Sequence, residues 1–282
     1  MSAALSSGQS AVPAKAPITG VVVSFNEGQL LERCLPSLDF CEEVLVINLE
    51  STDNTAEVAA RHGARVVNHP RVPVMELVLK WGSDQASHDW VLSIDPDEEM
   101  SPKLGRQIAE VITSGAAGSI GRLEIPWQFY FGDRALKGTY WGGENYKRGT
   151  MFHRDRVAHI QQVHHRPLPK EGYSSHLIPW EGDNVLHHYW MTDYRMFIEK
   201  HLRYLKMEGQ RRKHAGETFS WWRTIKDTSV SFAWSIIRRK AYLDGVVGIG
   251  LSGLYAWYVG SSWLSLRRLE GELSASHTAE KG

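Results

Sequence analysis

The sequence predicts an α/β fold with a Rossmann-like, mostly parallel sheet flanked by helices, followed by a helical, aromatic-rich C-terminal extension. Short apolar runs rich in β-branched residues alternate with single amphipathic stretches through the first half of the chain. Polar clusters follow three of these runs, where the carboxyl ends of parallel strands would meet. Tryptophan and tyrosine then concentrate between Trp127 and Trp263.

Each predicted element rests on a local pattern. The predicted strands are residues 18–25, 44–48, 64–67, 90–94 and 119–131, and the predicted helices are 27–38, a segment ending at His62-Gly63, 74–86, 102–113, 193–207 and 218–243. Gly63 supplies a helix stop. Residues 138–190 show weak periodicity and predict short strands and long loops that cover the site. Strands separated by single helices favour a parallel sheet.

The composition of the chain limits the possible classes of function. The chain has 282 residues and a formal net charge of zero, so nothing global indicates nucleic-acid binding. Its two cysteines favour a reducing, cytoplasmic compartment. We expect a disordered leader at residues 1–17, a catalytic domain at 18–190, a helical extension at 191–270 and a disordered tail at 271–282.

The segment Asp95-Pro96-Asp97-Glu98 carries the strongest chemical signal. Two carboxylates at a spacing of two, presented from a strand end, suit Mg²⁺ or Mn²⁺ bound against a nucleoside diphosphate. The alternative is a turn whose acidic residues precede the helix at Pro102. The position after an apolar strand, beside two further polar strand ends, favours the metal site at Asp95 and Asp97.

Two other loops predict donor contacts. In Ser24-Phe25-Asn26-Glu27, the polar side chains can contact a base or ribose, or Asn26 can cap the following helix. In the second loop, capping is the expected direct role of Ser51 and Asp53, while Asn48 is the better ligand contact.

Together these segments resemble the family 2 glycosyltransferases with a GT-A fold. That family has a T-x-N-E-like first loop, a D-x-G-S-T-D-x-T second loop and a D-x-D third loop. This chain has SFNE, NLESTDNT and DPDE in the same order. The resemblance covers roughly residues 18–115, and weaker similarity around His187-His188-Tyr189 is to the branch that builds lipopolysaccharide core or other envelope glycans.

The resemblance implies a site with two departures. Asn48 stands where the family has an acidic residue that contacts uracil or ribose, and Glu50 stands where it has glycine. His164-His165 stand where the envelope branch has a His-Glu pair. Donor-binding residues are expected at Ser24, Phe25, Asn26, Glu27, Asn48, Asp53, Asp95, Pro96, Lys147 and Arg148.

The catalytic base of an inverting transfer must lie near the acceptor hydroxyl. Glu144 lies in a glycine-rich aromatic loop and is the candidate carboxylate, with a solvated loop charge as the alternative. His164 is the candidate histidine. His164 or His188 can instead complete the metal shell.

The C-terminal extension suggests contact with a membrane. Residues 245–266 carry no charge, and residues 191–240 contain twelve Lys or Arg against five Asp or Glu. The uncharged segment can span a bilayer, lie at its interface, or form a core helix with small-residue packing. We expect attachment to the cytoplasmic face of the inner membrane without crossing it.

The sequence therefore predicts a metal-dependent, inverting glycosyltransferase that uses a nucleotide-diphosphate sugar and a cell-envelope glycan or lipid-linked acceptor. The alternative is a catalytically weak or inactive nucleotide-sugar-binding protein on the same fold, suggested by Asn48 and the absent His-Glu pair. A nucleotidyltransferase ranks lower because the first loop has a single glycine.

Overall fold

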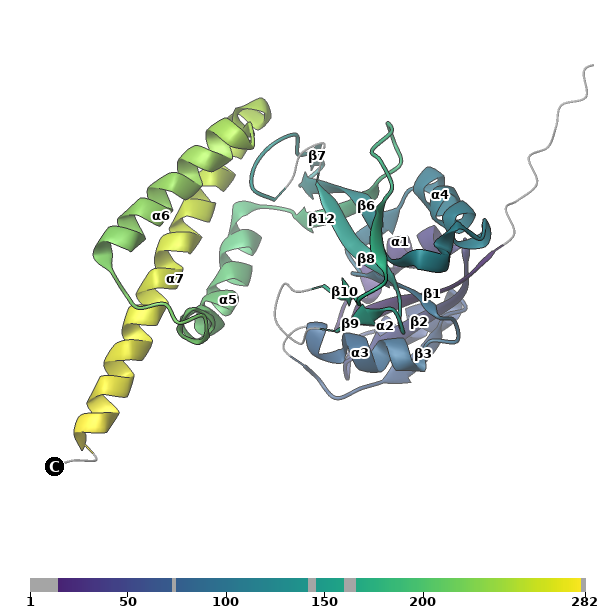
Figure 1. The fold of residues 1–282 in the computed structure, drawn as a ribbon, viewed down its shortest axis with the longest axis horizontal. Helices are drawn as coiled ribbons and strands as arrows, with labels where there is room; N and C mark the ends of the chain where they lie inside the picture. Colours follow the sequence, from purple (N-terminus) through teal and green to yellow (C-terminus); the bar gives the residue numbers. More distant parts are fainter. Residues whose placement is uncertain (1–14, 73–74, 142–145, 160–165, 280–282) are drawn as a thin grey trace, which may run out of the picture. The chain divides into compact units, whose positions relative to one another are not determined.

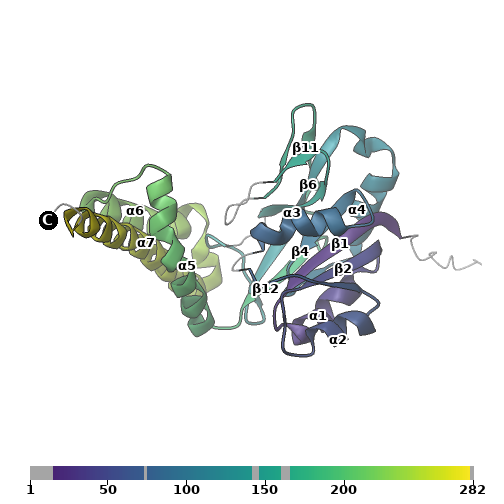
Figure 2. The same ribbon diagram turned by 90° about the horizontal axis from the view of Figure 1, so that it is seen from below.

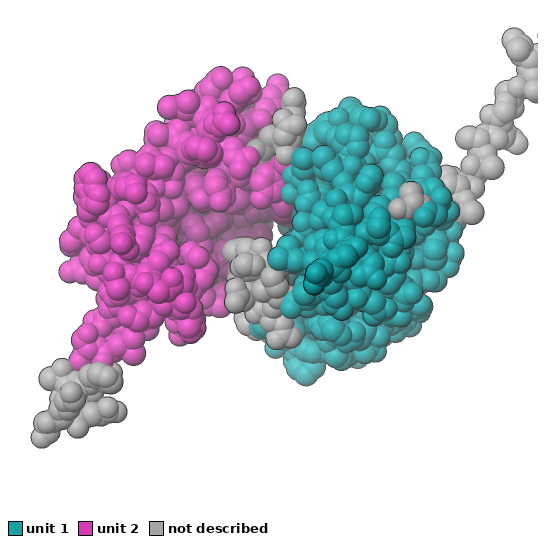
Figure 3. Space-filling model, viewed as in Figure 1, with its two compact units in different colours: residues 1–126, 147–186 teal, residues 127–146, 187–282 magenta. Residues whose placement is uncertain are grey.

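The computed structural model describes residues 15–72, 75–141, 146–159 and 166–279. The chain divides into two compact units (Figure 3). One comprises residues 1–126 and 147–186, and the other comprises 127–146 and 187–282. We call them the sheet unit and the helical unit.

Parallel strands form the first half of the sheet, in the order β3-β2-β1-β4. Their bounds are β1 Ala16–Ser24, β2 Cys41–Asn48, β3 Arg65–Asn68 and β4 Trp90–Ile94. β1 and β4 are almost entirely buried, as expected for β-branched strands covered on both faces.

Helices cover both faces of these strands. They are α1 Gly28–Cys34, α2 Thr55–Arg61, α3 Glu76–Gln85 and α4 Pro102–Thr113 (Figure 1). Figure 2 shows α1 and α2 on one face and α3 on the other. On the α3 face, Val78 and Leu79 join a core that includes Val21 and Ile47. α4 begins where Ser101 accepts a hydrogen bond from the Leu104 amide at 3.3 Å.

Antiparallel pairing extends the sheet beyond β4, to β8 and then to β6. The remaining strands are β5 Glu98–Met100, β6 Ile120–Phe131, β7 Arg134–Ala135, β8 Lys147–His153, β9 Val157–Ala158, β10 Leu168–Pro169, β11 Ser174–Leu177 and β12 Leu186–Met191. β12 lies between β6 and β5 in the sheet order. The predicted fold class, a mostly parallel α/β sheet flanked by helices with a helical extension, is confirmed.

The helical unit is built around a long helix, α7 Gly245–Ala279. α5 Tyr194–His214 and α6 Trp221–Ala233 lie alongside it in Figures 1 and 2, and α6 runs into a π-helix, η3 Trp234–Arg238, followed by η4 Ala241–Asp244. Small residues permit the close packing. A Cβ on Gly248 would meet the Ala241 carbonyl oxygen at 1.9 Å.

The uncharged segment 245–266 forms the first part of α7, with Leu251, Trp263 and Leu266 buried and Val246 and Ile249 exposed. No helix in the described ranges is both long enough and apolar enough to cross a bilayer.

Several predicted boundaries were wrong, among them the end of α5, which continues past the predicted residue 207 to His214. β1 begins at Ala16, inside the expected leader, because the Ala16 amide bonds the Phe40 carbonyl at 2.8 Å. The predicted helix 27–38 changes to a 3₁₀ turn at Leu35, where Pro36 has no amide hydrogen to donate. α7 continues to Ala279 through the expected tail, which has no proline to stop it. The predicted domain boundary at 190/191 stays a prediction.

Candidate metal and donor site

Three polar loops meet at one edge of the parallel sheet. Ser24 at the end of β1 is paired with Asn48 at the end of β2, and Val22 is paired with Ile94 at the end of β4. The chain therefore leaves all three strands at the same edge. This is where α/β sheets bind their ligands.

Hydrogen bonds join the first loop to the second. The Asn26 amide donates to the Ser51 hydroxyl at 3.0 Å, and the Asn26 side-chain oxygen accepts from the Thr52 amide at 2.7 Å. Asp53 accepts from the Gly28 amide at 3.1 Å and from the Thr55 amide at 3.0 Å. One carboxylate thus satisfies amides at the starts of both α1 and α2.

Asn26 does not cap α1, contrary to the capping alternative. The N-cap position belongs to Glu27, and no side chain caps the helix there. Asn26 instead has a φ of 54°, in the left-handed region that asparagine tolerates better than most residues. This conformation accompanies its contacts with the second loop.

Glu50 also has a left-handed backbone, with a φ of 57°. Glycine adopts this conformation without the steric cost that a Cβ brings. The departure from glycine at this position therefore places strain in the second loop.

Asp95 in the third loop is held by a buried ion-pair network. The Arg148 guanidinium donates to Asp95 Oδ2 at 2.8 Å and pairs with Glu98 Oε1. Glu98 Oε2 accepts from the Asp95 amide at 2.8 Å. The side chains of Arg148 and Glu98 are 4% and 0% exposed. Burial disfavours the charged guanidinium, but the charges of Asp95 and Glu98 outweigh it, so the pKa of Arg148 is raised.

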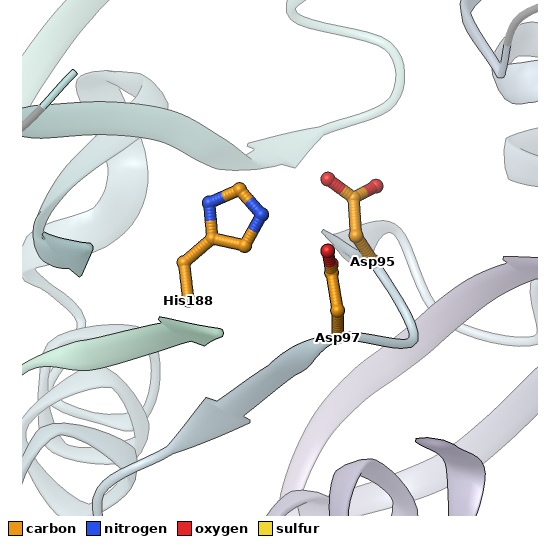
Figure 4. Close-up of side chains that lie close together, drawn as sticks. All are labelled: Asp95, Asp97 and His188. Carbon is orange, nitrogen blue, oxygen red and sulfur yellow. The ribbon is translucent and has the colours of Figure 1, made fainter. Parts of the chain in front are cut away.

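A group of three side chains suits a divalent metal. One carboxylate oxygen each from Asp95 and Asp97 and a ring nitrogen of His188, on β12, all lie within 4.8 Å of one another (Figure 4). Carboxylate oxygens suit both Mn²⁺ and Mg²⁺, whereas an imidazole nitrogen is uncommon around Mg²⁺, which favours all-oxygen shells. The His188 ring is stacked on Trp127, with 4.8 Å between centroids.

Glu27 adds a further carboxyl group to this edge of the sheet. Burial, together with the smaller effect of the negative charges of Asp97 and Asp95, raises its pKa to about 7, against a hydrogen bond from the Phe25 amide that lowers it. A shift of this kind is typical of a functional site.

Several predicted site residues lie at this edge with defined contacts. Asn48 is buried, accepts from the Ser51 amide and donates to Asn68 Oδ1, each at 3.0 Å. The Arg71 guanidinium lies 3.8 Å from the centre of the Phe25 ring. Lys147 is exposed at the start of β8. The roles of these residues toward a donor stay predictions.

Glu144 and His164, the candidate bases, lie outside the described residues. Arg148, predicted to bind the diphosphate, lies against Asp95 and Glu98, and its role toward a donor stays a prediction. No role was predicted for Glu98. The sequence shows Glu98 as a third acidic residue directly after Asp97. It does not show that the partner of Glu98 is Arg148, which lies on β8, 50 residues further along the chain.

Comparison with known proteins gives relatives that are named as uncharacterized glycosyltransferases. The chain is 33% identical over 98 residues to an uncharacterized glycosyltransferase of Rickettsia prowazekii, covering 34% of this chain and 33% of that protein. It is 35% identical over 117 residues to an uncharacterized glycosyltransferase of Mycobacterium bovis, covering 39% and 53%. The matches thus span about a third and about half of these relatives.

Solved structures include more distant similarities. The mannosyltransferase PcManGT from Pyrobaculum calidifontis, in complex with GDP-Man and Mn²⁺, is 15% identical with a TM-score of 0.46, covering 94% of this chain and 82% of that one. Glucosyl-3-phosphoglycerate synthase from Mycobacterium tuberculosis, in complex with Mn²⁺ and UDP-glucose, is 23% identical with a TM-score of 0.31, covering 40% and 43%.

The sequence model described as Glycosyl transferase family 2 matches residues 19–176, which include the three loops and Arg148. This match covers more than half of the 282 residues, and the chain therefore belongs to glycosyl transferase family 2.

Proposed function

We propose that this protein transfers a sugar, with inversion, from a nucleotide-diphosphate donor to a cell-envelope glycan or lipid-linked acceptor, as in lipopolysaccharide biosynthesis, and that the reaction requires Mg²⁺ or Mn²⁺. The observation that carries the proposal is the grouping of Asp95, Asp97 and His188 at the edge where β1, β2 and β4 end. Membership of family 2 supports the reaction class.

Asp97 and His188 would hold the metal together with the oxygen of Asp95 that faces them. When bound, the metal neutralises the diphosphate and so assists its departure. Because Arg148 occupies Oδ2 of Asp95, that carboxylate has a fixed orientation. Asp97 is the better choice for direct ligation, and Asp95 would be shared between ribose and metal.

The first and second loops would bind the nucleotide. Ser24, Phe25, Asn26 and Glu27 supply the first loop, and Asn48 and Asp53 support the second. The hydrogen bonds between the loops fix their backbones before a donor arrives, which lowers the entropic cost of binding. Lys147 would add positive charge for the diphosphate, and Pro96 shapes the third loop.

Glu144 and His164 remain the proposed candidates for the base that deprotonates the acceptor hydroxyl. A lipid-linked acceptor would place the reaction at the cytoplasmic face of the inner membrane. This location belongs to the proposal.

The test is thermal unfolding with nucleoside diphosphates and their sugars, with and without Mn²⁺, because a ligand of the folded state raises Tm. We expect one base to give an Mn²⁺-dependent rise that Asp97→Asn abolishes, together with donor hydrolysis. The matched control is Asp84→Asn, on the exposed face of α3, where Asp84 pairs with Lys80. Full activity and an unchanged Tm rise in Asp97→Asn would refute the proposal.

A second candidate function is nucleotide-sugar binding without turnover. It is favoured by Asn48, whose amide is engaged by Ser51 and Asn68 at the position where the family has an acidic residue. An Mn²⁺-dependent Tm rise without hydrolysis or transfer from any donor would favour it. Detectable hydrolysis of a nucleotide sugar would exclude it.

A further inference from the structure

α6 and the π-helix that continues it expose a broad apolar face. The side chains of Trp222 and Ile237 are the most exposed of this group, at 74% and 73%. The exposed apolar residues of this face are Trp221, Trp222, Ile225, Val230, Phe232, Trp234 and Ile237. Several large apolar side chains exposed on one element of a folded protein generally mark a contact with a partner or a membrane.

The inward side of the same helix is polar. Thr224 and Ser235 are buried, and the Ser235 hydroxyl lies 2.8 Å from that of Ser252 on α7. Asp227 accepts a hydrogen bond from the Trp263 indole at 3.1 Å. α6 therefore turns polar groups toward its neighbour and apolar groups outward, the reverse of a helix that faces water.

The charged side chains around this face are mainly basic. Residues 220–250 contain five basic and two acidic side chains. The basic residues Arg223, Lys226, Arg238, Arg239 and Lys240 are all exposed.

Both acidic residues of that segment are engaged internally. Asp227 bonds Trp263, and the buried Asp244 accepts from the amides of Lys137 at 2.9 Å and Gly138 at 2.8 Å. Every fully exposed charged side chain of the segment is therefore basic, since Asp227 is half-buried and Asp244 is buried.

We propose that the apolar face of α6 and η3 lies on the surface of an anionic lipid bilayer, with its tryptophans in the interface and its basic residues against lipid phosphates. Amphipathic aromatic rings beside exposed cations are the chemistry that such an interface recognises. A symmetric contact with a second copy would bring the same five cations together. The inference uses the helical unit alone, so it is independent of the proposed transfer reaction.

The experiment is flotation of the full chain with vesicles of phosphatidylcholine alone and of phosphatidylcholine and phosphatidylglycerol in about a 3:1 ratio. We expect binding to the anionic vesicles, weakened by high salt. The double variant Trp222→Ala/Ile237→Ala should bind at least about tenfold more weakly, because it removes two large apolar side chains from the interface. Both side chains are exposed, so its Tm should match that of the original protein.

The matched control is Leu168→Ala/Tyr173→Ala, which removes two exposed apolar side chains from the sheet unit and should leave vesicle binding unchanged. Absence of binding to anionic vesicles would overturn the inference, as would equal losses in both double variants. A dimer that dissociates in Trp222→Ala/Ile237→Ala, without vesicle binding by the original protein, would assign the face to a second copy and also overturn it.

Discussion

Replacing Arg148 with methionine tests whether the buried ion-pair network holds the third loop. Methionine keeps much of the length and apolar volume of the arginine stem but removes the guanidinium. The change therefore takes one cation away from Asp95 and Glu98, which it contacts through separate nitrogens.

The expected effect on stability is large because the pair is buried. Glu98 is 0% exposed and Arg148 is 4% exposed, so the carboxylate left behind cannot recover its hydration. Removing one partner of such a pair costs about 3–5 kcal/mol. At roughly 2–4 °C per kcal/mol for a unit of this size, Tm should fall by about 6–20 °C.

The assay is thermal unfolding of the full chain, followed by circular dichroism. The control is Arg61→Met, which breaks the exposed pair with Glu32 and should leave Tm nearly unchanged because solvent screens this pair. The double variant Arg148→Met/Glu98→Gln should recover at least half of the lost Tm, because it also removes the buried negative charge that the guanidinium had balanced. It should still show a weaker Mn²⁺-dependent rise, since Asp95 has lost its hydrogen bond from Arg148.

Two results would refute the reasoning. In one, Arg148→Met unfolds within about 2 °C of the Arg61→Met control. In the other, the double variant is less stable than Arg148→Met alone, which would mean that the uncompensated charge of Glu98 is not the source of the loss.

Three further predictions concern other features of the molecule. Because the folded-state pKa of Glu27 is raised to about 7, its contribution to stability is complete below its ordinary pKa and is lost as pH rises through 7, by up to about 1.4 kcal/mol per pH unit. Tm measured from pH 5 to 8.5 without metal should show this loss, and Glu27→Gln should remove it. Parallel curves of Tm against pH for the two proteins would contradict the raised pKa of Glu27. Gly248→Ala should destabilise by about 1–3 kcal/mol in urea unfolding because its Cβ meets the Ala241 carbonyl, whereas Gly253→Ala, on the same helix with open space around it, should stabilise by up to about 1 kcal/mol; equal effects would argue against the close approach. Glu50→Gly should raise the free energy of unfolding by roughly 1 kcal/mol through relief of its left-handed backbone, and a loss in the same urea assay would count against strain there.

Local sequence patterns predicted the strands, whose formation depends mainly on neighbouring residues. The run Val21–Val23 and the run Leu45–Ile47 are buried strands because β-branched, apolar residues suit a sheet covered on both faces. Since parallel strands end at a common edge, the sequence also placed Ser24, Asn48 and Asp95 together.

Contacts between distant residues could not be predicted in the same way. No spacing rule links Glu98 to Arg148, because their pairing depends on β8 lying beside β4 in the sheet. The left-handed backbone of Asn26 likewise depends on Ser51 and Thr52 in another loop. Each of these features arises from tertiary packing.

The outward-facing apolar side of α6 likewise depends on tertiary packing. Its composition indicated membrane contact, but only the packing against α7 distinguishes the exposed Trp222 from the buried Trp263. The sequence suggested membrane contact for residues 191–240 and 245–266, and the exposed apolar face lies on α6 and η3, within the first of these segments.

The bonds of Asn26 and Asp53 across the first two loops have a consequence for protein engineering and for divergence within the family. A graft that imports the first loop from a relative would replace the residues that the Thr52 amide and the Asp53 carboxylate contact. The two loops therefore form one exchangeable module, and a chimera designed to accept a different donor must carry both.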